Sequence, residues 1–332
     1  MTLVAGVSAN GIQYEFEWHG YRAVVTGTGA GLRLLQHDGR DLIVGFPADE
    51  PMPNFRGALA APWPNRIASG RYPVDGVDRQ LPVNEPGREC ALHGLVFDRN
   101  WRLLERTTAE VVLGLRLPSS AGYPFDLDLV ARYELGPDGL TTTVEATNVG
   151  GGTAPYGVCP HPYLRAGDSP LDSWLLTLPA DSYLRVTPDR LLPAGLAEVA
   201  DGPDGSFDFR RPRSIGATKI DHAFTGIVRE PARKGSGRDG LVGGSLSAEL
   251  GTGLATVELR EVCGRGVAMS FGPECGWLQI HTADLPAPGL NRLGLAVEPM
   301  TCPPDAFNSG TDLIRLAPGA SHRASWSIRA LE

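Results

Sequence analysis

The sequence predicts an all-β protein, a large antiparallel β-sandwich with little helix, in which residues 1–332 form a single domain. Short apolar runs rich in β-branched and aromatic residues recur along the chain, with turn residues between them. No stretch of about 12 residues or more repeats its apolar positions with the helical period. Glycine and proline are abundant, 42 and 28 residues, without a repeating period, which indicates many turns.

The strands are expected in groups along the chain. Residues 21–46 alternate apolar runs with Gly-rich and Asp-Gly turns, as in a β-meander. Residues 129–150 give the clearest hairpin, because two β-rich runs flank the turn "GPDG". Residues 255–282 are expected to hold three more strands, and "HRASWSIRAL" near the end of the sequence another. Sheets of such strands pack face to face as a sandwich.

Two segments do not resemble strands. Residues 47–64 are rich in proline and are expected to form a long ordered loop. Residues 228–247 are rich in glycine, serine and charge, the composition of a mobile loop. Neither is expected to link two domains, because the same β pattern resumes on each side.

Charge and cysteine content limit the expected partners and location. The net charge is −8, lysine occurs only at Lys219 and Lys234, and no basic block is present, so nucleic acid is not an expected partner. No apolar run approaches the ~18–20 residues that span a bilayer, and the N-terminal residues do not resemble a signal peptide. The five cysteines are odd in number and widely spaced, as in free thiols of a reducing compartment. We therefore expect a cytoplasmic protein without membrane contact.

Two short motifs lack the context that their chemistry needs. "GTGAGL" at 27–32 has Leu32 where the dinucleotide fingerprint has its last glycine, and it opens no helix. Cys159 and His161 are metal-ligand types, but no paired ligands follow at a zinc-like spacing. No nucleotide cofactor and no metal are expected.

A histidine and a glutamate occupy unusual backbone positions. His161 lies between two prolines in "GVCPHPYLR" (157–165), which stiffen the backbone and offer no N–H to a sheet. This segment either aims the imidazole or forms a strand-edge turn with a surface histidine. Glu298 ends the apolar run in "LAVEPM" (295–300), where a carboxylate is costly to desolvate unless it has a partner or a chemical role. A salt bridge to an arginine across the sandwich is the alternative.

Polar residues of two earlier stretches are further candidates. Asn65 and Arg66 follow two prolines in "APWPNRIASGRY" (61–72), and His93 precedes a glycine in "ECALHGLVF" (89–97). Arg66 also fits a surface ion pair, and His93 also fits a turn. A shared site requires these side chains to meet in space, which their spacing alone does not show.

These stretches, in this order, resemble the aldose 1-epimerase (galactose mutarotase) family. The most specific mark is a Glu-Pro followed by Pro-Asp-Ala-Phe-Asn, and the marks together span residues 65–308. They are "NRI" (65–67), "LHG" (92–94), "HPYL" (161–164), "KIDHAF" (219–224), "WLQIHT" (277–282) and "VEPMTCPPDAFN" (297–308).

The resemblance implies a galactose mutarotase-like supersandwich that interconverts the α and β anomers of free aldoses of the glucose and galactose type without a cofactor. By this similarity, Glu298 is the general base that takes the proton of the C1 hydroxyl, and His161 is the general acid that protonates the ring oxygen. The ring then opens, the C1–C2 bond rotates, and the ring closes on the other face with the roles reversed. Such groups each contribute roughly 10²–10⁴ in rate.

The other matching residues imply contacts with the sugar. His93 would hydrogen-bond near the ring oxygen or C1 and so assist catalysis. Asn65, Arg66, Asp221 and Gln279 would hold sugar hydroxyls. The expected partner is therefore a small-molecule sugar, and the oligomeric state stays open between a monomer and a homodimer.

The sequence departs from the family pattern near the expected pocket. Leu164 and Arg165 follow "HPY" where the family commonly has Phe and a polar residue, and His281 stands where a tyrosine is expected. Trp277 belongs either to an apolar surface for the sugar ring or to the core. These positions leave the proposed acid and base unchanged but affect the choice of substrate.

Two related functions are alternatives. A hexose-6-phosphate mutarotase needs arginines near C6 of the sugar, which Arg56, Arg71 and Arg165 could supply. A non-catalytic carbohydrate-binding β-sandwich keeps the pocket but has no need for both Glu298 and His161.

Two further functions are less specific. A structural or interaction protein is neither supported nor excluded by the acidic composition. A glycoside hydrolase usually needs two carboxylates, so it requires Asp221 to face Glu298 across a sugar.

Overall fold

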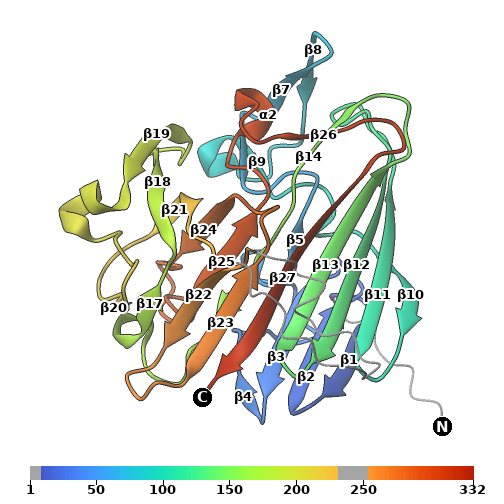
Figure 1. Ribbon diagram of the computed structural model, residues 1–332. Coiled ribbons are helices and arrows are strands. Elements are labelled where there is room, and N and C mark those ends of the chain that lie inside the picture. The colour runs from blue at the N-terminus through green and yellow to red at the C-terminus, as the bar shows by residue number, and fades with distance from the viewer. Residues whose placement is uncertain (1–8, 231–252) are drawn as a thin grey trace.

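The computed structural model describes residues 9–230 and 253–332, and it confirms the predicted all-β fold (Figure 1). Helix within this part of the chain is limited to α2 (Ala306–Ser309) and short 3₁₀ segments. The 3₁₀ segments are Pro86–Arg88, Leu171–Ser173, Val199–Asp201 and Pro203–Gly205. None of the helices in the described residues is long and apolar enough to cross a membrane.

The larger of two main sheets is antiparallel and has nine strands. In spatial order they are β10 (Arg102–Arg106), β11 (Glu110–Leu117), β12 (Leu127–Gly136), β13 (Gly139–Asn148), β27 (Ser321–Leu331), β23 (Gly266–Phe271), β22 (Ala255–Arg260), β17 (Leu175–Thr177) and β20 (Arg213–Ser214). The predicted hairpin at 129–150 is confirmed as β12 and β13, which pair from Leu127 opposite Asn148 to Gly136 opposite Gly139. The predicted C-terminal strand is β27.

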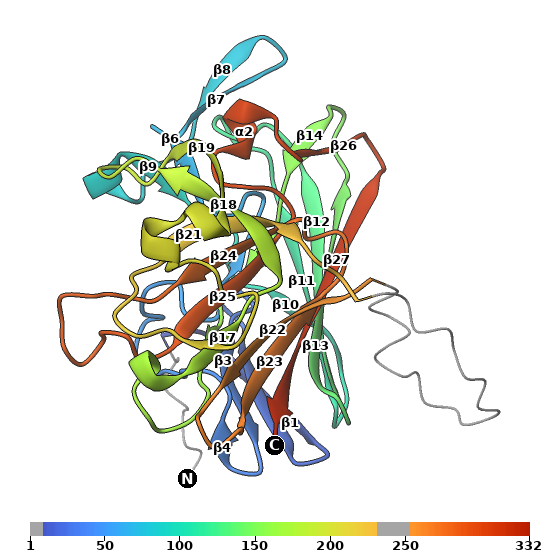
Figure 2. The ribbon, with the colours of Figure 1, turned by 60° about the vertical axis from the view of Figure 1, so that its left-hand side comes forward.

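The second main sheet carries the residues of greatest interest. Its six strands, in spatial order, are β16 (Tyr163–Leu164), β25 (Leu295–Met300), β24 (Trp277–His281), β21 (Asp221–Ile227), β18 (Ala180–Val186) and β19 (Pro193–Glu198). Figure 2 shows the two sheets as separate layers, with β18, β21, β24 and β25 in one and β11, β12, β13 and β27 in the other.

Smaller sheets complete the fold. The meander predicted at 21–46 is confirmed as β2 (Tyr21–Thr26), β3 (Leu32–His37) and β4 (Arg40–Asp41). A strand that was not predicted, β1 (Gln13–Trp18), pairs with β2 and makes this a four-stranded sheet. Four two-stranded pairs are β5 (Leu59–Ala60) with β15 (Cys159–Pro160), β6 (Arg66–Ala68) with β9 (Cys90–Leu92), β7 (Arg71–Val74) with β8 (Val77–Gln80), and β14 (Ala154–Tyr156) with β26 (Ile314–Leu316).

The structure can be compared with the predictions for the two loops and for the cysteines. The Pro-rich stretch 47–64 is irregular except for β5. The Gly- and Ser-rich stretch 228–247 lies outside the described residues from position 231 onward. None of the five cysteines forms a disulfide, and all except Cys263 are buried.

Alternation along β25 places Glu298 on the outer face of the six-stranded sheet. Val297 and Ile280 pack into the main core between the sheets. Because successive side chains of a strand point to opposite faces, Glu298 and its cross-strand partner Gln279 point the other way. Met300 lies on that outer face in a small group of buried residues that we call the outer apolar cluster: Ala60, Cys159, Leu184, Ala223, Trp277 and Met300. The strand is therefore buried on both faces, which explains its nearly continuous apolar sequence.

Candidate active site

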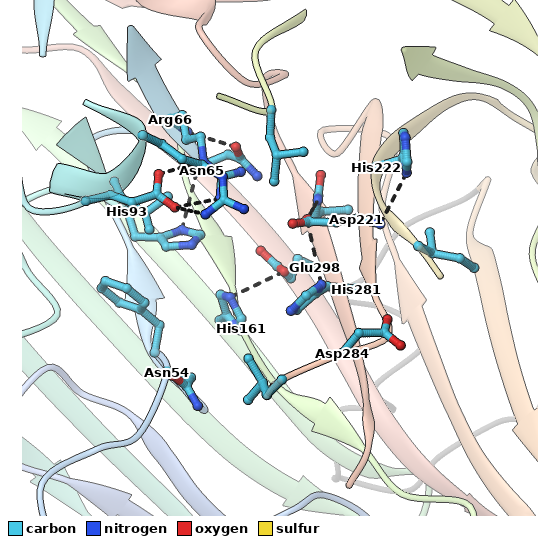
Figure 3. A pocket seen from close by; sticks show the side chains of 18 of the residues that line it. Asn54, Asn65, Arg66, His93, His161, Asp221, His222, His281, Asp284 and Glu298 are labelled. Carbon is cyan, nitrogen blue, oxygen red and sulfur yellow. Dashed lines mark hydrogen bonds and ion pairs between the residues drawn. The ribbon is translucent and has the colours of Figure 1, made fainter. Parts of the chain in front are cut away.

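The structure brings together all of the residues predicted for the site. They line one cavity of about 610 Å³ on the outer face of the six-stranded sheet (Figure 3). They are Asn65, Arg66, His93, His161, Asp221, Gln279 and Glu298. Since these residues lie on segments far apart in the sequence, tertiary packing rather than local spacing forms the cavity.

Glu298 is the most deeply buried acid of the cavity, with 1% of its surface exposed. Its Oε1 lies 3.4 Å from Nε2 of His161, so its partner is a histidine and not an arginine across the sandwich. Burial raises the pKa of Glu298 well above its ordinary value, the Asp221 carboxylate adds to this, and Arg66 opposes it. Burial thus favours the protonated carboxyl.

Backbone contacts fix the position of His161. Its N–H donates to Ala58 O at 2.9 Å, and its carbonyl accepts from Gly57 N at 2.8 Å. The ring stacks on Tyr163 with the centroids 5.3 Å apart. The side chain is 93% covered, so the surface-turn interpretation is wrong and the stiff Pro-His-Pro segment holds a buried imidazole.

His161 and Glu298 form a coupled pair, which we call the dyad. Burial lowers the pKa of His161 to about 3, while it raises the pKa of Glu298. Opposite shifts of this kind leave one proton on the pair across a wide pH range, because the first group resists protonation and the second resists ionisation. A pair with one proton can accept at one atom and donate at the other.

His93 and Asn65 hold each other in left-handed backbone conformations. Their φ angles are +58° and +54°, and the His93 N–H donates to Asn65 O at 3.0 Å. The Asn65 N–H in turn donates to Nδ1 of His93 at 3.3 Å. Nδ1 is therefore an acceptor, which places the ring proton on Nε2. Burial lowers the pKa of His93 well below its ordinary value, so the ring is a neutral donor.

Gly94 is required beside this pair. Its φ is +78°, and a Cβ there would lie 2.0 Å from the carbonyl oxygen of Ala61. The close approach of the two backbones sets the position of His93. His93 thus does lie in a turn, as one interpretation of the sequence held, and it also lines the cavity.

Arg66 is held by Glu85 in a two-pronged contact. Nε and Nη2 of Arg66 donate to the two carboxylate oxygens of Glu85 at 2.7 and 2.9 Å. Nη1 of Arg88 also pairs with Glu85, 3.2 Å from its Oε1. Burial opposes the charge of Arg66, but the bonds to Glu85 leave its pKa raised. Arg66 is therefore a buried, positioned cation rather than a surface ion pair.

Three polar side chains line the neighbouring strands β21 and β24. Gln279 Nε2 donates to Asp221 Oδ1 at 2.7 Å, and His281 Nδ1 lies 3.8 Å from the same oxygen. Among the described residues, neither Oε1 of Gln279 nor Nδ1 of His281 has a hydrogen-bond partner, and both atoms are buried.

Sequence reasoning missed several cavity residues. Phe55 lies 4.8 Å from the ring of His93 and 6.4 Å from that of His161, but an aromatic in an irregular Pro-rich loop gives no periodic signal. Tyr163 belongs to the "HPYL" motif, but no function was predicted for it from the sequence. The other missed residues are Asn54, Asn84, Glu85, Arg88, Leu92, Leu191, Lys219, Ile220, His222, Asp284 and Leu285. His281, which the sequence marks as a departure near the expected pocket, does line the cavity.

The three arginines proposed for a phosphate do not line this cavity. Arg56 is buried with its guanidinium 5.5 Å from the Tyr163 ring centroid, Arg71 bonds to Gln80, and Arg165 pairs with Asp41. Trp277 does not line the cavity either. It is a buried residue of the outer apolar cluster, and its indole N–H donates to Asp312.

The donor atoms of His93, His161 and Glu298 lie within 4.8 Å of one another, a set that could in principle hold a metal. The hydrogen bonds argue against it. A metal-binding imidazole normally donates its second N–H to an acceptor. Nδ1 of His93 instead faces the N–H of Asn65, and Nδ1 of His161 is buried without a partner. The residues present therefore do not fit a metal centre.

Comparison with known proteins identifies relatives along most of the chain. The family model described as aldose 1-epimerase matches residues 13–329. The uncharacterized protein YihR of Escherichia coli (strain K12) is 34% identical over 309 residues, which are 93% of this chain and 90% of that protein. Human galactose mutarotase is 31% identical over 218 residues, 62% of this chain and 61% of that protein.

Solved structures share the fold. The galactose 1-epimerase of Lactobacillus acidophilus NCFM superposes with a TM-score of 0.73 at 21% identity, covering 96% of this chain and 94% of that one. The GalM/aldose epimerase homologue of C. elegans gives 0.77 at 18% identity, covering 97% and 99%. At such identities the likeness shows the fold alone. The family is shown by the model match over residues 13–329 and by the 34% identity to the E. coli protein. The chain belongs to the aldose 1-epimerase family.

Proposed function

We propose that this protein catalyses the interconversion of the α and β anomers of free aldoses of the glucose and galactose type. The observation that carries the proposal is the buried dyad, in which Nε2 of His161 and Oε1 of Glu298 lie 3.4 Å apart in the cavity. A carbohydrate-binding module has no need to bury such a pair, which costs free energy. The galactose mutarotases among the relatives support the class of substrate.

The dyad supplies the acid and the base in turn. Glu298 takes the proton of the C1 hydroxyl while His161 gives a proton to the ring oxygen. The electron pair of the C1–O5 bond moves to O5, and the open-chain aldehyde forms. After rotation about C1–C2, His161 takes the O5 proton back, O5 attacks C1 from the other face, and Glu298 returns its proton to O1.

Burial of the dyad favours the protonation state that the open-chain intermediate requires. Ring opening ends with the proton on Glu298 and with His161 neutral. This is the arrangement that the raised pKa of Glu298 and the lowered pKa of His161 both favour. The cavity thus stabilises the protonation state of the open-chain intermediate relative to that of the closed ring.

Neutral and charged donors around the dyad position the sugar. Nε2–H of His93 is a neutral donor for the ring oxygen or O1, and it leaves the protonation of His161 undisturbed. Arg66, fixed by Glu85, donates to hydroxyls, and Asp221 accepts from them. Gln279 holds the Asp221 carboxylate in place through the bond from its Nε2. Precise holding of this kind is a large part of the rate gain.

The activity is tested by polarimetry on freshly dissolved α-D-glucose and α-D-galactose. We expect the purified protein to speed equilibration far above the buffer rate on both sugars. Glucose 6-phosphate should be a poorer substrate, because Arg56, Arg71 and Arg165 lie outside the cavity. Acceleration only on the phosphate would overturn the substrate class, and no acceleration on any of these sugars would overturn the activity.

A glycoside hydrolase is the second candidate, because Asp221 and Glu298 line the same cavity (Figure 3). The bond from Gln279 to Asp221 and the contact of Glu298 with His161 give each carboxyl a different neighbour. We therefore expect no release of nitrophenol from p-nitrophenyl α- or β-galactoside. Release that disappears in Asp221→Asn would favour the hydrolase instead.

A further inference from the structure

Cys159 contacts the second oxygen of the carboxyl in the dyad. Its Sγ lies 3.8 Å from Oε2 of Glu298, while Oε1 faces His161. The thiol is fully buried. Its remaining neighbours in the outer apolar cluster are Ala60, Leu184, Ala223, Trp277 and Met300. The two oxygens of Glu298 therefore have different partners, an imidazole and a thiol.

The sulfur of Cys159 remains protonated. Burial raises the pKa of the thiol well above its ordinary value, and the neighbouring Glu298 adds to this. A protonated thiol beside a carboxylate oxygen is a donor, and S–H is a weak one. The fixed backbone of β15, which pairs Cys159 with Ala60, keeps the sulfur in place.

The other ionisable and polar groups around Glu298 come from several elements. His161 and Tyr163 lie on or beside β16, Gln279 and His281 on β24, Asp221 on β21, and Arg66 and His93 on or beside β6 and β9. Among the described residues, Cys159 is the one that donates a hydrogen bond to Oε2 of Glu298.

We propose that Cys159 is a positioning residue for the anomerisation proposed above: its thiol orients Glu298 so that Oε1 faces His161 and the sugar, and it stabilises the carboxylate only weakly. A stronger donor would hold the charge on Glu298 and make it a poorer base. A missing donor would leave Oε2 without compensation and make the carboxyl harder to ionise.

Two substitutions of Cys159 should shift the alkaline limb of the kcat/KM profile in opposite directions from its wild-type position. In Cys159→Ser, the stronger O–H donor should shift the alkaline limb of the kcat/KM profile down by about one pH unit. In Cys159→Ala, loss of the donor should shift that limb up by about half a unit. The matched control is Cys275→Ser, a fully buried thiol outside the cavity, which should leave the limb unchanged. Limbs that stay in place in both variants, or move in the same direction, would overturn the proposal.

An infrared measurement gives the same answer without turnover. The carboxyl C=O band of Glu298 is assigned by its loss in Glu298→Gln. The pH at which this band disappears should be lower in Cys159→Ser and higher in Cys159→Ala than in the wild type. If Cys159→Ser does not fold, the upward shift in Cys159→Ala decides, and its absence refutes the role of the thiol. A wild-type protein without mutarotase activity would refute the proposed reaction, whereas this band would still test Cys159.

Discussion

At the scale of single residues, the site depends on two groups that burial shifts in opposite directions. His161 and Glu298 are both removed from water, and within residues 9–230 and 253–332 their recorded ion-pair contact is with each other. Each therefore prefers its neutral form, and the dyad retains one proton. His93 remains neutral beside them because burial lowers its pKa, and the backbone N–H of Asn65 donates to its Nδ1.

The pH dependence follows from these shifts. Activity requires one proton on the dyad, so it is lost at low pH when His161 also becomes protonated. Because the pKa of His161 is lowered to about 3, the acidic limb of kcat/KM should lie well below the ordinary histidine range. At high pH, activity is lost as Glu298 ionises with His161 neutral, which its raised pKa delays. A pH–rate profile with an acidic limb near 6.5 would show that His161 titrates as an exposed histidine.

Burial of Glu298 should also lower the stability of the protein. Its folded-state pKa is raised above the ordinary 4.5, so the stability contributed by the protonated carboxyl is complete below pH 4.5 and is lost as pH rises through the folded pKa. Glu298→Gln removes this titration, and we expect it to raise the free energy of unfolding by about 1–2 kcal/mol at high pH. The two proteins should converge near pH 4 in urea titrations. A variant less stable than the wild type at every pH would show that the carboxylate is well compensated.

At the scale of elements, the site is built where short strands and turns cover the outer face of the six-stranded sheet. Strands β5, β6, β9 and β15 are two or three residues long, yet they align the segments that carry Asn65, His93 and His161. Left-handed backbone occurs in this part of the site, since Asn65 and His93 both have positive φ and Gly94, which also has positive φ, follows His93. Such backbone persists only where the surrounding contacts hold it.

A substitution at Gly94 tests whether the surrounding contacts hold this left-handed backbone. Gly94→Ala adds a methyl group 2.0 Å from a backbone oxygen at a φ of +78°, so we expect a loss of about 2–4 kcal/mol of stability. The matched control is Gly76→Ala, where φ is +74° and no atom lies within 4 Å, with an expected loss of about 1 kcal/mol from the backbone alone. Thermal or urea unfolding measures both. Equal losses would mean that the contact with Ala61 relaxes at no cost.

The elements differ in how far the sequence predicts them. The β12–β13 hairpin and the strands of 255–282 were predicted because alternation and turn residues are local properties. The two-residue strand β15 and the approach of Phe55 to His93 were not, because they depend on pairing with segments about a hundred and about forty residues away. In the same way, "LAVEPM" indicated a buried Glu298, but its contact with His161 needed the fold.

At the scale of the whole molecule, one apolar core joins the layers, and polar side chains connect sheets that share no strand. Arg40 is an example. From β4 of the four-stranded sheet it donates to Gly266 O at 2.9 Å and Leu331 O at 3.2 Å, at the ends of β23 and β27. These carbonyls belong to the nine-stranded sheet, so Arg40 ties the two sheets together.

Removal of this connection should be measurable. Arg40→Ala leaves partly buried carbonyls without their charged donor, and we expect a loss of about 1–3 kcal/mol in urea unfolding. Arg116→Ala is the control, because its pair with Asp128 is half exposed and such pairs contribute at most about 1 kcal/mol. A loss in Arg40→Ala no larger than in Arg116→Ala would assign the cohesion of the sheets to the apolar core alone.

The central claim is that one coupled pair performs the chemistry, and it is tested by kcat for α-D-galactose anomerisation in Glu298→Gln, His161→Ala and the double variant. We expect each single substitution to lower kcat by roughly 10² or more. The double variant should lose little beyond either single one, because a pair that acts as a unit fails when either member is removed. Near wild-type kcat in Glu298→Gln, or losses that multiply in the double variant, would contradict the dyad.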